Sequence, residues 1–239
     1  MKLEVCQLGR IPYPESTALQ NQLLALRQKN KIGDLLLLLE HPPVITVGKR
    51  KKTDNILMPQ EWFEQHHIGV YFTNRGGDVT YHGPGQIVGY PIIDLTNHGR
   101  DIRSFIRNIE QVFILLLQNY YRITAFRDPE HPGVWVKQGK ITAVGFAIKR
   151  WVTMHGFAFN VNTDLSHFQW IIPCGIADKN VCSLKSLLNY DIQLETANQQ
   201  VIASFAEVFH YQPVMIKRTQ IDQYIGQYLR SINHEKTQT

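Results

Sequence analysis

Apolar residues recur at steps of three and four between residues 102 and 120, and this repeat constrains the fold more than any other feature of the chain. The stripe comprises Ile102, Phe105, Ile106, Ile109, Val112, Phe113, Leu116, Leu117 and Tyr120. Such spacing places side chains on one face of an α-helix. Arg103, Arg107 and Glu110 fall off the stripe, and Asp101 precedes it as a candidate N-cap. The pattern predicts a helix that packs one face on a core.

Several short segments have the composition of β-strands separated by turns. They lie at residues 35–39, 44–47, 70–73, 86–95, 134–136, 140–148 and 153–161. The last three follow one another closely, which predicts an antiparallel meander. Pro91 interrupts the segment 86–95 and has no backbone N–H, so we expect it at a sheet edge or a bulge.

Helical spacing recurs at residues 183–188, 196–209 and 219–229. Helices and strands therefore alternate without a regular βαβ order, which predicts an α+β fold with a mixed, largely antiparallel sheet flanked by helices. No repeat or linker divides the sequence, and 239 residues suffice for a sizeable core. We expect a single domain over residues 1–239.

Charge and hydropathy narrow the class of protein. No apolar run approaches the ~20 residues that cross a bilayer, and the start of the chain lacks a signal-peptide pattern. We therefore expect a soluble, cytoplasmic protein without a membrane partner. The 25 Lys and Arg against 20 Asp and Glu give +5, but these residues are dispersed, which argues against a nucleic-acid partner. The one basic cluster, residues 49–52, fits either a solvated loop or a docking patch for an acidic protein.

Residues 75–86 contain four glycines and one proline, so they favour a loop that brings backbone N–H groups close to a ligand. Arg75, His82 and Gln86 add donors that could hold a carbonyl or thioester oxygen. The loop is not a phosphate loop, because no Gly-Lys-Ser/Thr ends it.

The three cysteines, Cys6, Cys174 and Cys182, show no CxxC spacing, which argues against a disulfide framework and a zinc site. Cys174 lies between Pro173 and Gly175, a setting typical of a constrained loop that exposes its sulfur. Lys140 begins a strand, and an ammonium near a thiol would lower the pKa of that thiol. The spacing of these two residues does not show that they touch.

Taken in order, segments 40–43, 75–86, 139–141, 155–162 and 173–175 resemble the lipoyl(octanoyl) transferase family. The resemblance covers roughly residues 35–190. It implies a fold related to biotin and lipoate protein ligases, and transfer of an octanoyl group from octanoyl-acyl carrier protein to a lysine. The implied acceptors are lipoyl domains of 2-oxoacid dehydrogenase subunits and the glycine cleavage H protein. No cofactor or metal is implied.

The resemblance also implies roles for individual residues. Cys174 would be the nucleophile, and Lys140 would lower its pKa. The implied substrate-binding residues are Arg75, Gly76, Gly77, Asp78, Val79, Thr80, Tyr81, His82, Ala143, Val144, Gly145, Gly156, Phe157 and Ala158.

Two other functions remain to be weighed. A lipoate or biotin ligase would share the fold but activate a free acid with ATP, and it would not need a cysteine nucleophile. The net positive charge would allow a non-enzymatic lipid- or nucleic-acid-binding module. The dispersed positions of the basic residues argue against it. We interpret Cys6, Cys182 and His41 as structural residues.

Overall fold

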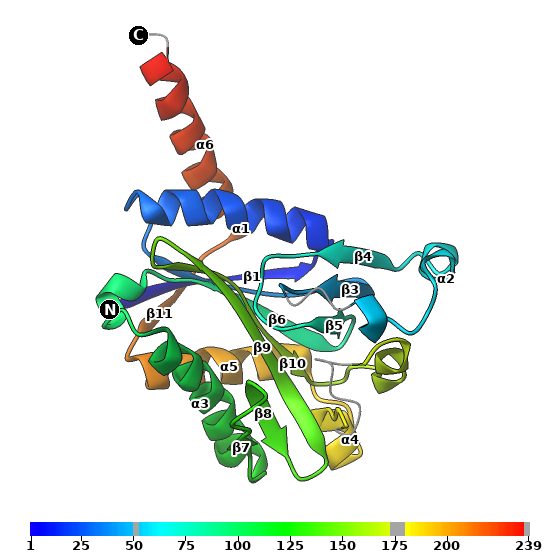
Figure 1. Ribbon diagram of the computed structural model, residues 1–239. Coiled ribbons are helices and arrows are strands. Elements are labelled where there is room, and N and C mark those ends of the chain that lie inside the picture. The colour runs from blue at the N-terminus through cyan, green and yellow to red at the C-terminus, as the bar shows by residue number, and fades with distance from the viewer. Residues whose placement is uncertain (50–52, 173–179, 237–239) are drawn as a thin grey trace.

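The computed structural model describes residues 1–49, 53–172 and 180–236. Its centre is an eight-stranded sheet, and a three-stranded sheet lies beside one end of it (Figure 1). In spatial order the large sheet consists of β11 (Gln212–Met215), β1 (Lys2–Arg10), β2 (Asp34–Glu40), β6 (Gln86–Ile92), β10 (Val152–Asn160), β9 (Gly139–Lys149), β8 (Gly133–Val136) and β7 (Phe126–Arg127).

The pairing in the large sheet is mostly antiparallel. Among the described residues, β1 pairs in parallel with β2 on one side and with β11 on the other, whereas β2, β6, β10, β9, β8 and β7 pair antiparallel in turn. The predicted meander is therefore confirmed as β8, β9 and β10, and the α+β class with a largely antiparallel sheet is confirmed with it.

The prediction for Pro91 is wrong in one respect, because β6 is a central strand. Pro91 pairs with Leu36 of β2, but the ladder between β6 and β10 ends two residues earlier, at Gly89. Beyond that point the Thr153 hydroxyl donates to the Pro91 carbonyl oxygen at 2.7 Å. A proline is tolerated in this central strand because the ladder on one side has already stopped.

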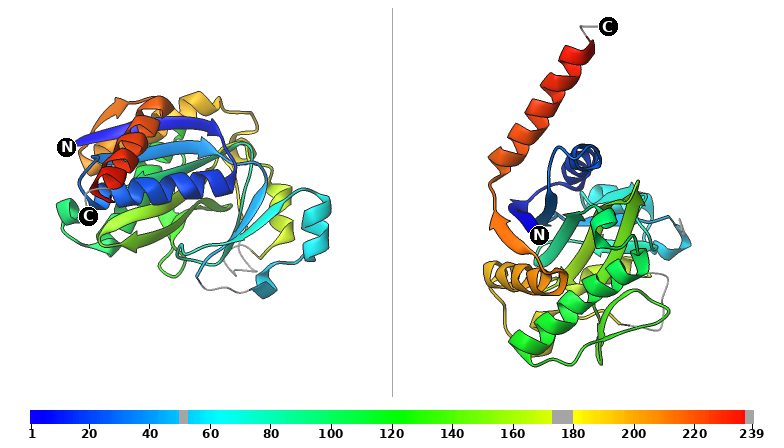
Figure 2. Two further views of the ribbon diagram at one scale, coloured as in Figure 1. Left: turned by 90° about the horizontal axis from the view of Figure 1, so that it is seen from above. Right: turned by 90° about the vertical axis from the view of Figure 1, so that its left-hand side faces the viewer.

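Helices cover both faces of the large sheet, as the two views in Figure 2 also show. α1 (Tyr13–Gln28) lies on one face, against β6 and β10. α3 (Ile102–Tyr121) and α5 (Leu194–Phe209) pack together on the other face. The remaining helices are η1 (Thr53–Asn55), α2 (Gln60–Gln65), η2 (Leu95–His98), η3 (Leu165–Trp170), α4 (Leu184–Leu188) and α6 (Arg218–Lys236), of which α6 projects from the body of the molecule.

α3 is the helix that the apolar repeat predicts. The Asp101 carboxylate caps it by accepting a hydrogen bond from the Ser104 N–H at 3.0 Å. Its central apolar residues, from Phe105 to Leu117, are buried, but Ile102 at its start remains 43% exposed. None of the helices in the described part of the chain is long and apolar enough to cross a membrane.

The small sheet has the order β4 (Gly69–Phe72), β3 (Val44–Val47) and β5 (Val79–His82). It encloses a separate apolar cluster that includes Ile45, Phe63 and Tyr81. β5 directly follows the first glycines of the loop. Because β5 belongs to the small sheet, this sheet holds residues 75–82 against β9 and β10.

Asp34, at the start of β2, joins several elements of the large sheet. Its buried carboxylate accepts hydrogen bonds from Arg27 Nε at 2.9 Å, the Tyr211 hydroxyl at 2.7 Å and the Asp94 N–H at 3.0 Å. Burial alone would raise the pKa of this carboxyl, but hydrogen bonds from His98, Tyr211, Asp94 and Arg27 outweigh it and lower the pKa to about 2.

This network makes stability depend on pH in a defined window. The folded pKa of Asp34 lies below its ordinary value of 3.8, so its contribution is present above pH 4 and is lost as pH falls toward 2. We expect Asp34→Asn to lower the free energy of unfolding at pH 7 by about 3 kcal/mol, because Arg27 then loses a buried partner. Between pH 4 and pH 2 the free energy of unfolding should also fall less in the variant than in the wild type.

Urea unfolding from pH 7 to pH 2 measures both effects, with the exposed Asp191→Asn as control. An Asp34→Asn protein as stable as this control at pH 7 would contradict the role of the network.

Candidate active site

The loop at residues 75–78 is held between the two sheets by the buried side chain of Arg75. Its guanidinium donates to the Thr46 carbonyl oxygen at 2.6 Å, to the Asp78 carbonyl oxygen at 2.7 Å and to the Gly76 carbonyl oxygen at 3.0 Å. It also donates to the Thr46 hydroxyl. These donors thus organise the loop and fasten it to β3.

Glycines let this loop lie directly on β9. The Gly76 N–H donates to the Phe146 carbonyl oxygen at 2.8 Å. A Cβ at Gly145 would lie 2.9 Å from the Gly76 carbonyl oxygen, and Gly77 has φ +85°, a conformation that favours glycine. Side chains at these positions would push the loop away from the strand.

Two cavities lie beneath the loop. The first, which we call the histidine cavity, has a volume of about 50 Å³ and is lined by residues that include Tyr13, His82 and His155. The second, the lysine cavity, has a volume of about 230 Å³ and reaches Lys140 and the start of α3. They share four wall residues, Gly77, Asp78, Val144 and Gly145.

Most of the predicted binding residues line these cavities. They are Arg75, Gly76, Gly77, Asp78, Thr80, His82, Ala143, Val144, Gly145, Gly156, Phe157 and Ala158. The side chains of Val79 and Tyr81 do not, because they alternate with Thr80 and His82 along β5 and pack in the core of the small sheet. The Tyr81 hydroxyl and His167 Nδ1 are 2.6 Å apart there.

The histidine cavity is also lined by residues that were not among the predicted binding residues, although His155 opens the motif segment 155–162. Tyr13 comes from α1, Tyr90 from β6 and His155 from β10. They are far apart in sequence, and no local motif links them. His155 Nε2 lies 2.6 Å from the Asn74 side-chain oxygen, which only accepts, so this nitrogen donates.

Burial keeps the histidines of this region neutral. It lowers the pKa of His41 to about 4 and that of His155 to about 4, in the latter case helped by the charge of Arg75. The pKa of His82 falls to about 3, because of burial and then the nearby His41 and Arg75. At pH 7 the wall of the cavity therefore carries uncharged imidazoles.

The interpretation of His41 as a structural residue fits its surroundings. Its Nδ1 donates to the Ile11 carbonyl oxygen at 2.7 Å, so the neutral Nε2 accepts from the Tyr90 hydroxyl at 2.8 Å. His82 is fixed in a similar way, with Nδ1 donating to the Gln86 side-chain oxygen at 2.8 Å.

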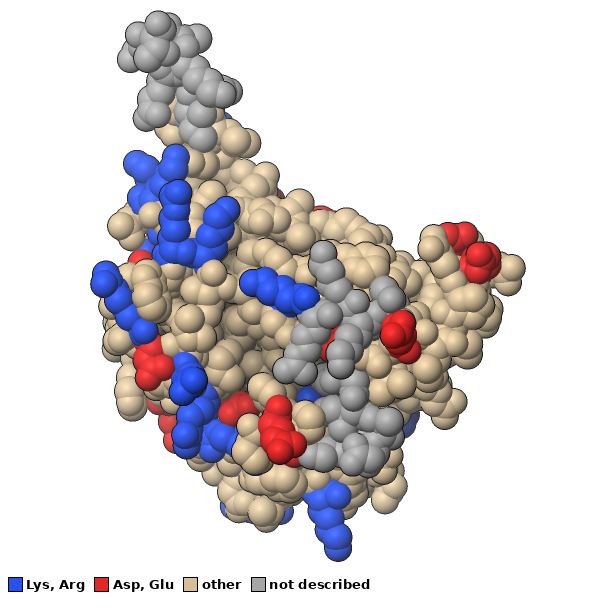
Figure 3. Space-filling view, in the orientation of Figure 1, with Lys and Arg blue, Asp and Glu red and all other residues tan. Residues whose placement is uncertain are grey.

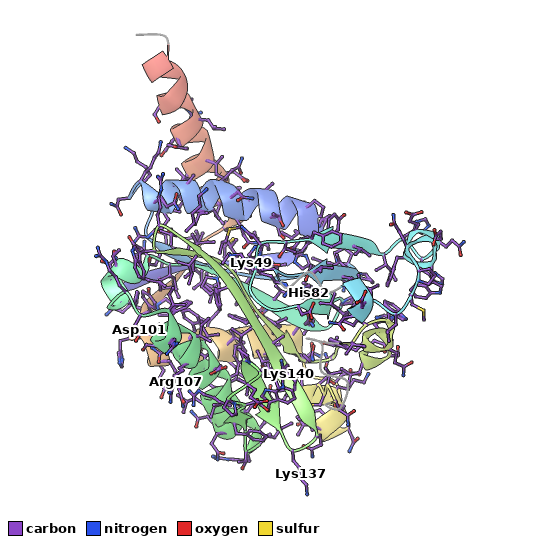
Figure 4. All side chains as sticks on the ribbon, in the orientation of Figure 1. Lys49, His82, Asp101, Arg107, Lys137 and Lys140 are labelled. Carbon is purple, nitrogen blue, oxygen red and sulfur yellow. The ribbon has the colours of Figure 1, made fainter. Side chains whose placement is uncertain are left out.

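Lys140 is buried at the start of β9, 6% exposed. Its ammonium donates to the Pro132 carbonyl oxygen at 3.2 Å and lies 4.8 Å from the centre of the Trp135 ring. Its backbone pairs with the chain at residues 180–182, because the Lys140 N–H donates to the Asn180 carbonyl oxygen and the Cys182 N–H donates to the Lys140 carbonyl oxygen. Figure 4 shows Lys140 on the strand that faces α3.

Cys174, the predicted nucleophile, lies outside the described residues. The other two cysteines are free thiols in the core. Burial raises the pKa of Cys6 to about 11 and that of Cys182 to about 12, so both are protonated at neutral pH. Neither has the properties of a nucleophile, which agrees with their interpretation as structural residues.

Among the described residues no group of three His, Cys, Asp or Glu side chains could hold a metal ion. Of the basic cluster at residues 49–52, only Lys49 is described. It is exposed, and its N–H donates to the Arg75 carbonyl oxygen, which places it beside the loop (Figure 4).

Comparison with known proteins agrees with this arrangement. Residues 12–206 match the model of the lipoyl protein ligase A/B catalytic domain. A curated octanoyltransferase of Desulforamulus reducens is 50% identical over 226 residues, which cover 95% of this chain and 99% of that protein. An octanoyltransferase of Caldicellulosiruptor saccharolyticus is 49% identical over 94% of this chain and 96% of its own length.

The fold resembles solved structures at much lower identity. A crystal structure of lipoate-protein ligase A bound with ATP superposes with a TM-score of 0.73 at 14% identity, covering 96% of this chain and 94% of that one. This likeness confirms the ligase-like fold that the motifs imply. Since the family model spans most of the sequence and the curated relatives are half identical over nearly their whole length, the chain belongs to the lipoyl protein ligase A/B catalytic-domain family and is an acyltransferase.

Proposed function

We propose that this protein transfers an octanoyl group from octanoyl-acyl carrier protein to the lysine of a lipoyl domain. The observation that carries this proposal is the pair of cavities that meet along β9, from Lys140 to the neutral histidines, under a loop held by glycines. A space of this kind suits an unbranched, uncharged chain attached to a reactive group near Lys140. The sequence identity to octanoyltransferases supports the same substrate.

The proposed reaction has two steps that balance in charge and protons. The Cys174 thiolate, paired with the Lys140 ammonium, attacks the thioester carbonyl and becomes acylated, and the carrier leaves as a thiol after taking a proton from Lys140. The neutral amine of the acceptor lysine then attacks the acyl-cysteine. An amide forms, Cys174 leaves as thiolate, and Lys140 takes up the proton from the amine.

The acceptors that we propose are the lipoyl domains of 2-oxoacid dehydrogenase subunits and the glycine cleavage H protein. The carrier thioester is already activated, so neither ATP nor a cofactor enters the scheme. We also propose that the protein works in the cytoplasm, a reducing compartment that keeps free thiols such as Cys6 and Cys182 reduced.

Acylation of Cys174 is the first test of this proposal. Incubation with octanoyl-acyl carrier protein should add the mass of one octanoyl group to the wild type and to the control Cys6→Ala, but none to Cys174→Ser. Intact-protein mass spectrometry measures this. If Cys174→Ala retained most of the transferase activity, the covalent mechanism would be wrong.

The same assay separates the transferase from an ATP-dependent ligase. A ligase would modify the acceptor when given free octanoate and ATP, and it would do so without Cys174. We expect no product from free octanoate, with or without ATP.

Lys140 should tune the reactivity of Cys174. Lys140→Ala removes the ammonium, so the apparent pKa for alkylation of Cys174 should rise, whereas Lys140→Arg should retain part of the charge effect but lose proton transfer. Iodoacetamide rates measured against pH provide the test, with the exposed Lys137→Ala as control. Superimposable profiles for the wild type and Lys140→Ala would eliminate this role.

The cavity walls should set a preferred chain length. Each buried methylene contributes about 0.8 kcal/mol, or roughly fourfold in affinity, so chains shorter than octanoyl should bind progressively more weakly. Longer chains should fail where the histidine cavity closes. Because a Cβ at Gly145 would meet the Gly76 carbonyl oxygen, Gly145→Val should lower activity and shift the optimum to shorter chains.

A series of acyl-carrier substrates from six to sixteen carbons measures this profile. Gly33→Val is a matched control, since a Cβ at Gly33 meets no atom within 4 Å. A flat profile in the wild type would argue against a closed channel.

A further inference from the structure

We propose that the basic surface formed by the start of α3 and the β9–β10 turn is the docking site of the acyl donor, an acidic carrier protein. This inference rests on the proposed function. It assigns the acyl donor to the side of the lysine cavity that α3 borders. The surface, which we call the α3 basic surface, consists of Lys29, Arg100, Arg103, Arg107, Lys149 and Arg150.

The first turns of α3 border the lysine cavity directly. Ile102 and Ile106 line this cavity on one face of the helix. Arg103 and Arg107 are exposed one position further along, and their spacing of four residues places them side by side. An apolar entrance and a pair of guanidinium groups therefore lie next to each other on one helix.

The β9–β10 turn extends this positive charge. Lys149 and Arg150 are exposed, and Ile148 before them lines the lysine cavity. The Arg100 guanidinium carbon lies 5.9 Å from the centre of the Trp151 ring, which joins the turn to the start of α3.

The end of α1 completes the surface. The Gln28 side chain donates to the Lys149 carbonyl oxygen at 2.7 Å, which brings the end of α1 beside the turn, and the exposed Lys29 that follows has its ammonium 4.9 Å from the centre of the Tyr228 ring of α6. Figure 3 shows Lys and Arg side chains, in blue, along the left side of a hollow in the molecular surface, with Asp and Glu side chains, in red, among and beside them. Figure 4 shows Arg107 on α3 and Lys140 on β9 on the same side of the molecule.

The charge balance of this surface points to an acidic partner. Its six residues are cationic, against two exposed carboxylates nearby: Asp101, which serves as the N-cap of α3, and Glu130, which lines the lysine cavity. Exposed charges of one sign attract an oppositely charged protein and raise its association rate. Salt at physiological ionic strength screens the attraction over about 8 Å, so it acts only on a partner that lies close to the surface.

The apolar entrance favours the donor over the acceptor. Ile102, Ile106 and Ile148 would contact whatever passes from this surface toward Lys140. A thioester on an uncharged arm can pass such side chains without a desolvation cost for a charge, whereas the acceptor lysine must first lose its proton to do so.

Charge reversal on α3 tests this docking site. The double variant Arg103→Glu/Arg107→Glu should raise KM for octanoyl-acyl carrier protein at least about tenfold, with kcat little changed, because exposed charges act mainly on association. KM for the small thioester octanoyl-pantetheine should stay at the wild-type value. Increasing salt should raise the wild-type KM for the carrier and have little effect on that of the variant.

A control with the same change in net charge isolates the position of the charges. Lys137 lies in the β8–β9 turn, where Figure 4 shows it pointing away from the molecule, and Lys217 precedes α6; both are exposed. Lys137→Glu/Lys217→Glu should keep the wild-type KM for the carrier. Because Arg103 and Arg107 are exposed near a helix start, where Glu is well tolerated, the test variant should keep its thermal midpoint.

Three results would overturn the docking site. They are an unchanged KM in the test variant, an equal rise in the control, or slowing confined to transfer from pre-acylated enzyme to the lipoyl domain. The last result would assign the surface to the acceptor. A wild-type protein that takes no octanoyl group from either thioester would instead overturn the proposed function, and the docking site with it.

Discussion

The hydrogen bonds of the Arg75 guanidinium are the interaction on which the rest of the site depends. They join the Thr46 carbonyl of the small sheet to the Asp78 carbonyl of the loop, and the Asp78 carbonyl also accepts from the Gly48 N–H at 3.0 Å. Because the next residue, Gly76, bonds to β9, the loop is held from both sides. The shape of both cavities follows from this fixed position.

The same guanidinium influences protonation in the histidine cavity. Its charge adds to burial in lowering the pKa values of His82 and His155. One end of the combined space is therefore lined by uncharged imidazoles beside Arg75 and Asp78, whereas the other end holds the Lys140 ammonium.

Local patterns in the sequence predicted the parts of the structure that depend on neighbouring residues. The apolar repeat and Asp101 predicted α3, and short apolar segments predicted the β8–β10 meander. The glycine-rich motif located six of the residues that line the two cavities, between Arg75 and His82. Val79 and Tyr81 were included with it, although strand alternation already indicated that they would face away from Thr80 and His82.

Other features depend on contacts that a single sequence does not reveal. Tyr13, Tyr90 and His155 meet only because α1 packs across β6 and β10. The carbonyl groups that accept hydrogen bonds from Arg75 come from β3 and from the loop itself, and no sequence pattern links Thr46 to Arg75. Likewise, the position of Pro91 in a central strand depends on where the neighbouring ladder ends.

The parallel pairing of β1 with both β2 and β11 has a consequence for the order in which the molecule is assembled. Among the strands of the large sheet β1 leaves the ribosome first, and β11, which covers its second edge, leaves last. During translation β1 can pair with β2 on one side while its other edge keeps unpaired backbone groups, which favour association with other chains. Closure of the sheet therefore waits until residues 212–215 are synthesised.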